Sequence, residues 1–202
     1  MARTKGSSGA RTKEAIKKAG RELIYQHGYE GMNLRQLADR VGIMQGSLYN
    51  HIKSKQDLLF LLMREHLEGL VRDLDSALHN IEGAVAKLRA FVRFHVIRHM
   101  EHRDEVYINN SELRSLEPRN LRTIVALRAA YERRIIDILT EGRTVKVFDI
   151  ADPKIAAFVL IAMLTGVCAW YKPSGRRSQE QLVKIHVAMA LNAVLTKAHH
   201  TH

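Results

Sequence analysis

Cysteine and proline are scarce in this sequence of 202 residues, which contains one cysteine, Cys168, and three prolines. A single cysteine excludes a disulfide within the chain, and it leaves a zinc site without its usual thiolate ligands. We therefore expect no bound metal, no cofactor and a reducing, cytoplasmic compartment. The first ten residues are basic and contain no apolar core, so we do not interpret them as a signal peptide.

Strand-like alternation is also rare. The stretch TVKVFDI (144–150) alternates in hydrophobicity, but it stands alone, and we interpret it as a loop. Elsewhere apolar residues recur at helical spacing, and capping residues precede several of these stretches. The sequence therefore predicts an all-α fold with helices at residues 11–27, 34–41, 45–51, 55–79, 83–102, 119–141, 153–171 and 179–198.

Long hydrophobic runs are limited to residues 155–171, a stretch of seventeen residues without a charge. A transmembrane helix needs about twenty apolar residues, and this run contains Thr165 and Gly166. We therefore predict a helix of a globular protein that is buried on most of its sides, and no association with a membrane.

Positive charge exceeds negative charge, with a net charge of +11 and a pI of about 10.0. Residues 1–55 contain eleven Lys or Arg against four Asp or Glu, a net charge of +7, whereas residues 56–202 have a net charge of only +4. A basic first quarter on a nearly neutral remainder is typical of a nucleic-acid-binding head joined to a separate body.

The stretch LADRVGIMQGSLYNHIKSKQDLL, residues 37–59, contains the elements of a DNA-binding motif. Asn33 with Gln36 predicts an N-terminal cap for its first helix. Gly42 can adopt the left-handed conformation that ends a helix, and a second short helix follows from Gln45. Two short helices joined in this way indicate a helix-turn-helix, whose second helix lies in the major groove.

The side chains of this motif divide into an inner and an outer set. Leu37, Val41, Ile43 and Leu48 are expected to form a small core. The amides of the outer set suit base edges, its hydroxyl and imidazole groups suit phosphates, and its glycine lets backbone approach DNA. The outer set comprises Gln45, Gly46, Ser47, Tyr49, Asn50 and His51. The alternative is a structural turn between two helices whose polar residues only face solvent.

The whole N-terminal stretch resembles the DNA-binding domain of TetR-type transcriptional regulators. Members of that family have a first helix followed by "GY", a capping residue, an "IA…AGV" turn and "LYxHFxxKxxLL". Residues 11–60 contain Gly28-Tyr29, Asn33, "LADRVGI" and "SLYNHIKSKQDLL" in this order. Asn33 stands where the family usually has Thr, and Ile52 stands where it often has Phe.

The resemblance implies a domain organisation and a set of DNA contacts. Residues 1–10 would be a flexible basic arm, residues 11–54 a three-helix DNA-binding head, and residues 55–202 a helical-bundle body for ligand binding and dimerisation. The double-stranded partner would be a palindromic operator. The candidate DNA contacts are Arg35, Gln45, Gly46, Ser47, Tyr49, Asn50, His51 and Lys55.

Two apolar helices of the body suggest how the chain associates. The helices at 153–171 and 179–198 present more apolar surface than a monomer usually exposes. Two such helices from each of two chains make a four-helix interface, which is the usual arrangement in the family. We therefore expect a homodimer.

The segment TGVCAWYKPSGRRSQEQLV, residues 165–183, resembles the branch of TetR regulators that responds to acyl-CoA thioesters. The resemblance implies a small-molecule effector, an acyl-CoA, that releases the protein from DNA. Cations beside aromatic rings suit the phosphates and adenine of coenzyme A, and apolar side chains suit the acyl group. The candidate effector contacts are Phe94, Arg98, Tyr107, Asn109, Tyr131, Trp170, Tyr171 and Arg176.

Two other functions remain open at this point. A helical enzyme acting on CoA esters would leave the DNA-binding head unexplained, and no nucleophile or carboxylate–histidine spacing supports it. An architectural DNA-binding protein without a ligand would have a body packed without a cavity. The leading prediction is a dimeric, ligand-responsive repressor without enzymatic activity.

Overall fold

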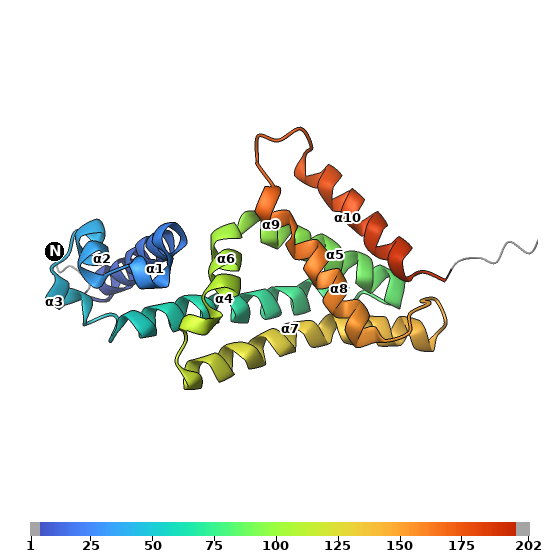
Figure 1. The fold of residues 1–202 in the computed structure, drawn as a ribbon, viewed down its shortest axis with the longest axis horizontal. Helices are drawn as coiled ribbons and strands as arrows, with labels where there is room; N and C mark the ends of the chain where they lie inside the picture. The colour runs from blue at the N-terminus through green and yellow to red at the C-terminus, as the bar shows by residue number, and fades with distance from the viewer. Residues whose placement is uncertain (1–4, 197–202) are drawn as a thin grey trace, which may run out of the picture. The chain divides into compact units, whose positions relative to one another are not determined.

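The computed structural model describes residues 5–196 of the chain. This range is helical and contains no β-strand, which confirms the predicted all-α fold. An isolated antiparallel bridge joins Phe148 to Leu195, so the alternating TVKVFDI stretch is a loop with one backbone pairing. The helices (Figure 1) are α1 Lys5–Gly31, α2 Leu34–Val41, α3 Gln45–Leu48, α4 Lys55–Leu78, α5 Ala84–Glu101, α6 Arg103–Ser111, η1 Leu113–Ser115, α7 Pro118–Thr144, α8 Pro153–Thr165, α9 Val167–Trp170 and α10 Gln179–Val194.

Several helix boundaries differ from the prediction. Helix α1 begins at Lys5, inside the segment 1–10 predicted to be a flexible arm; the rest of that segment, residues 1–4, lies outside the described residues. The backbone of α1 is non-helical at Gly28, where φ is 71°, so the predicted stop is a break within the helix. The predicted helix 153–171 is divided into α8 and α9 at Gly166. Helix α6 and the 3₁₀ turn η1 were not predicted.

The chain forms two compact units, and each contains segments from distant parts of the sequence. The first unit contains the described residues up to His66 together with Asp104–Val125. The second unit contains Leu67–Arg103 together with the described residues from Ala126 onward. The predicted head at 11–54 and body at 55–202 would group residues 104–125 with the body, whereas these residues cluster with the first unit.

The core of the first unit joins its N-terminal helices to the start of α4. Leu37 and Leu48 are fully buried, as expected for the core of a helix-turn-helix, whereas Val41 and Ile43 are half-buried. Further buried side chains complete this core: Ile16, Leu23, Ile24, Ala38, Ile52, Leu58 and Leu59.

In the second unit, α8 and α10 both pack on α5 (Figure 1). Asp152 caps α8 through bonds from the backbone N–H groups of Lys154 and Ile155, and Pro153 follows it at the first helical position. Ser178 caps α10, where its exchange of bonds with Gln181 confirms the predicted capping box.

Helix α8 leaves much of its apolar surface uncovered in the single chain. Val159 is 63% exposed, and Ile155 and Phe158 are 57% and 41% exposed. By length and composition alone the segment Pro153–Trp170 is apolar enough to cross a membrane, and 22% of it is buried. The prediction of a helix buried on most sides is therefore wrong for the single chain, because only one face of α8 packs on α5.

A polar cluster lies in the core of the second unit. His95 bonds through Nδ1 to the Tyr131 hydroxyl at 3.0 Å and through Nε2 to the Thr165 hydroxyl at 3.1 Å. Its ring stacks on His99, with the two ring centres 3.6 Å apart. Burial, with smaller contributions from His99 and His186, holds the pKa of His95 well below 6.5. Burial also lowers the pKa of His99 to about 4.

These two histidines predict that the protein loses stability in mild acid. The unfolded chain binds protons at both imidazoles near pH 6.5, whereas the folded chain keeps them neutral, so the free energy of unfolding falls as the pH drops from 6.5 toward 4. Each histidine contributes about 1.4 kcal/mol per pH unit at most within this window. Urea unfolding of the wild type and of His99→Gln, at one protein concentration and several pH values, should give a shallower slope for the variant. The exposed His27→Gln provides the matched control, and equal slopes for wild type and His99→Gln would contradict the assignment.

Candidate functional site

The turn between α2 and α3 is closed by backbone bonds that require a left-handed residue. Gly42 has φ 73° and ψ 35°, and it donates to the Asp39 carbonyl at 3.1 Å. The N–H of Ile43 donates to the Ala38 carbonyl at 3.0 Å, which completes a Schellman motif. At the other end of α2 the Asn33 carboxamide oxygen accepts from the Gln36 N–H at 2.8 Å, as the sequence predicts. These bonds fix the direction in which α3 leaves the turn.

Helix α3 is short and buries only one of its side chains. Leu48 is fully buried and anchors the helix to the core of the first unit. The remaining surface is available to a ligand, and Tyr49, just after the helix, is 51% exposed. Of the predicted DNA contacts, Arg35, Gln45, Gly46, Ser47, Tyr49 and Asn50 are exposed, and His51 and Lys55 are half-buried.

Lys55 is half-buried, and contacts within the protein hold its side chain. Its ammonium donates to the Glu30 carbonyl at 3.0 Å and lies 4.4 Å from the centre of the Tyr29 ring. An ammonium group has three N–H donors, so one bond to a carbonyl leaves capacity for a phosphate. The same contacts tie the start of α4 to the segment that follows the break at Gly28.

The segment 104–117 contacts α1 and the start of α4 through several hydrogen bonds, which no pattern in the sequence predicts. Gln56 donates to the Tyr29 hydroxyl at 3.2 Å and to the Ser115 carbonyl at 2.8 Å, and it accepts from the Glu117 N–H at 3.0 Å. The Tyr29 N–H donates to Glu112 at 3.2 Å.

Two contacts between α1 and α6 extend this junction within the first unit. Arg21 and Glu105 form an ion pair. The ring of Tyr107 packs edge-to-face on Tyr25 with 5.2 Å between the ring centres. Tyr107 and Asn109, two of the predicted effector contacts, therefore belong to the first unit, where Asn109 is buried and Tyr107 is 50% exposed.

The other predicted effector contacts lie in the second unit. Tyr131 is buried beside His95, and Arg98 pairs with Asp73 at 3.1 Å. Trp170 is 53% exposed and stacks on His186, with 6.1 Å between the ring centres. Phe94 and Tyr171 are half-buried, and Arg176 is exposed.

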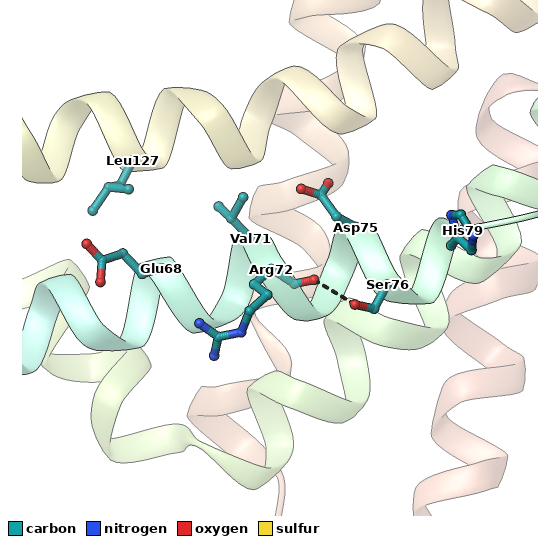
Figure 2. Close-up of a pocket in the computed structure, with 7 residues that line it drawn as sticks. All are labelled: Glu68, Val71, Arg72, Asp75, Ser76, His79 and Leu127. Carbon is teal, nitrogen blue, oxygen red and sulfur yellow. Dashed lines mark hydrogen bonds between the residues drawn. The ribbon is translucent and has the colours of Figure 1, made fainter.

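A groove of about 570 Å³ lies between α4 and α7 in the second unit. Figure 2 shows Val71 and Asp75 directed from α4 toward α7, where Leu127 lies. Arg134 of α7 donates two bonds to the Asp75 carboxylate, at 2.9 and 2.8 Å, and this pairing lowers the pKa of Asp75. The remaining lining residues are Glu68, Arg72, Ser76 and His79. These residues have mixed charges and lie on the exposed side of α4, so their sequence pattern does not predict a groove.

Comparison with known proteins assigns both parts of the chain to one type of regulator. Residues 16–62 match the family described as bacterial regulatory proteins, tetR family. Residues 82–194, more than half of the chain, match the tetracyclin repressor-like C-terminal domain.

Individual relatives agree with these matches over nearly the full length. The transcriptional repressor KstR2 of Mycolicibacterium smegmatis is 27% identical over 199 residues, which cover 96% of each chain. The structure of AibR in complex with isovaleryl coenzyme A and operator DNA is 26% identical, with a TM-score of 0.81, and the match covers 88% of this chain and 97% of AibR. A regulatory protein from Rhodococcus RHA1 shares the fold at 23% identity, with a TM-score of 0.86, over 93% of this chain and 98% of the other.

Replacement of Gly46 separates DNA contact from folding. A Cβ atom built on Gly46 meets no atom within 4 Å, and alanine favours a helix by about 1 kcal/mol over glycine. Gly46→Ala should therefore keep or raise the melting temperature. If the backbone of α3 approaches DNA at this residue, affinity for an operator selected from random DNA should fall at least tenfold, or about 1.4 kcal/mol.

The control for this experiment is Gly69→Ala within α4, where an added Cβ lies 3.6 Å from the nearest side-chain atom. This variant should bind the operator like the wild type. Wild-type affinity in Gly46→Ala would remove residue 46 from the DNA interface.

Proposed function

The chain belongs to the tetR family of bacterial regulatory proteins, and from this membership we propose that it is a dimeric repressor. The dimer binds a palindromic operator, and an acyl-CoA thioester releases the protein from this DNA. The observation that carries the proposal is the exposed helix α3, which follows a closed turn and is anchored by one buried leucine. Its polar side chains are the types that read base edges and phosphates.

The effector class is supported by the relatives. AibR is described in complex with isovaleryl coenzyme A and operator DNA, and its match covers most of both chains. In the second unit, the rings of Trp170 and Tyr171 and the guanidinium of Arg176 remain our candidates for the coenzyme A part. The α4–α7 groove also favours a ligand-responsive body over an architectural one, because it offers a hollow beside α4.

Release requires that the thioester bind one state of the protein more tightly than the other. The recognition segment comprises residues 45–54 and contains the recognition helix α3. Helix α4 follows this segment directly at Lys55 and runs without a break to Leu78 in the second unit. A ligand that moves α4 in the second unit therefore shifts the recognition helix away from its groove in DNA. The protein would act in the cytoplasm and have no enzymatic role.

To test the effector class, binding of the protein to its operator DNA is measured in the presence of different thioesters. Isovaleryl-CoA, palmitoyl-CoA and a ring-bearing acyl-CoA should be compared with free CoA and the matching free acids. One thioester should release DNA at lower concentration than its acid or free CoA, because each of these supplies half of the contacts. Arg176→Gln should raise the concentration needed, and Arg133→Gln on the exposed side of α7 is the matched control. Release by free acids alone, or by none of the ligands, would overturn the thioester assignment while leaving DNA binding intact.

Dimerisation is tested by placing a charge on the apolar face of α8. Val159→Asp should give a monomer in sedimentation velocity at low micromolar concentration, because the aspartate would have to be buried without a partner. Its monomer fold should persist, since residue 159 is 63% exposed in the single chain. Val125→Asp, at a helical valine that is 52% exposed in α7, should stay dimeric. A monomeric wild type, or a dimeric Val159→Asp, would contradict the proposed interface.

A further inference from the structure

A second groove of the second unit is not used by the proposed function. It lies between α5 and α10 and has a volume of about 500 Å³. Val183, Val187 and Leu191 form its floor and are 2%, 6% and 7% exposed. Its rim contains Arg89 and Arg93 from α5 together with Glu180 and Lys184 from α10.

The two helices run in opposite directions along this groove. Arg93 donates to both carboxylate oxygens of Glu180, at 3.0 and 2.9 Å, at the start of α10. At the other end, Leu195 pairs with Phe148 just beyond α7, and Lys87 near the start of α5 bonds Glu141 near the end of α7. One turn from the Arg93–Glu180 pair, Arg89 and Lys184 therefore lie on facing helices.

The groove is thus cationic at one end and apolar at the other. Glu180 neutralises Arg93, but no ion pair or hydrogen bond engages the side chains of Arg89 or Lys184 among the described residues. Beyond them the floor continues through Val187 and Leu191 to Leu195. The α10 positions 184–195 span about 16 Å along a helix axis, which accommodates an extended alkyl chain of medium length.

We propose that the α5–α10 groove is a binding site for a single-chain amphipathic anion, an alkyl carboxylate. The carboxylate lies between the Arg89 guanidinium and the Lys184 ammonium, which donate charge-assisted hydrogen bonds to it. The alkyl chain lies along the valine and leucine floor and removes apolar surface from water.

The full-length protein offers a direct readout, because the floor consists of valine and leucine methyl groups. Titration with sodium decanoate, below its micellar concentration, is followed by ¹³C-methyl NMR. Saturable shifts should be confined to the methyls of Val183, Val187, Leu191 and Leu195. The double variant Arg89→Gln/Lys184→Gln should weaken binding at least tenfold, whereas Arg133→Gln/Lys146→Gln, which removes the same charge outside the groove, should change it less than twofold.

Two further arms separate the charged end from the apolar end. Ala188 lines the groove and is exposed, so Ala188→Trp should fill it and abolish the shifts without changing the charge. Decyltrimethylammonium has the same chain with the opposite charge and should bind at least tenfold more weakly. The proposal is overturned if decanoate produces no saturable shifts, if Arg89→Gln/Lys184→Gln or Ala188→Trp binds like the wild type, or if the cationic ligand binds equally. None of these arms involves DNA or coenzyme A, so the result is independent of the proposed repressor.

Discussion

The carboxamide of Gln56 joins parts of the first unit that lie far apart in the sequence. Its nitrogen donates to the Tyr29 hydroxyl and the Ser115 carbonyl, and its oxygen accepts from the Glu117 N–H. Gln56 is the second residue of α4 and follows directly after the recognition segment. The placement of that segment therefore depends on residues 115–117, and loss of any one bond leaves a partly buried polar group to be satisfied elsewhere. The helices of the DNA-binding motif therefore share one compact unit with residues 104–125.

On the proposed function, this composite construction determines how the effector acts on the head. The chain passes between the two units three times: within α4 after His66, at Arg103–Asp104, and within α7 after Val125. On the proposed function, a ligand in the second unit acts on the head through α6 and α7 as well as through α4. On the proposed function, α6 is well suited to this role, because its Glu105 and Tyr107 contact Arg21 and Tyr25 of α1 directly.

The sequence predicted the elements whose ends are fixed by local chemistry. Helix ends depend on interactions within a few residues, so they can be predicted without knowledge of the tertiary structure. Examples are the Asn33 and Ser178 caps, the left-handed Gly42 and the start of α8 at Asp152–Pro153. Helix α6 was missed because α5 ends at His102 without glycine or proline, and because only Val106, Ile108 and Asn109 of α6 are buried. Effector contacts were predicted from a family resemblance and from residue type, but tertiary packing decides their partners: Tyr131 meets His95 and Tyr107 meets Tyr25. Whether the eight candidates touch an effector stays a prediction.

The proposed dimer accounts for two features of the single chain, the short helix α3 and the exposed face of α8. Helix α3 has four residues and buries only Leu48, so one head offers few side chains to base edges. Single DNA-binding modules of this kind bury about 600–1,000 Å² against DNA, and two linked modules gain affinity because the second binding event becomes intramolecular. Helix α8 leaves Val159 and Ile155 exposed to solvent in the single chain. On its packed side, the hydroxyl of Thr165 bonds to His95 of α5, which is buried. On the proposed function, a second chain covers this apolar face of α8. The same contact that covers α8 would then set the separation of the two recognition helices along the operator.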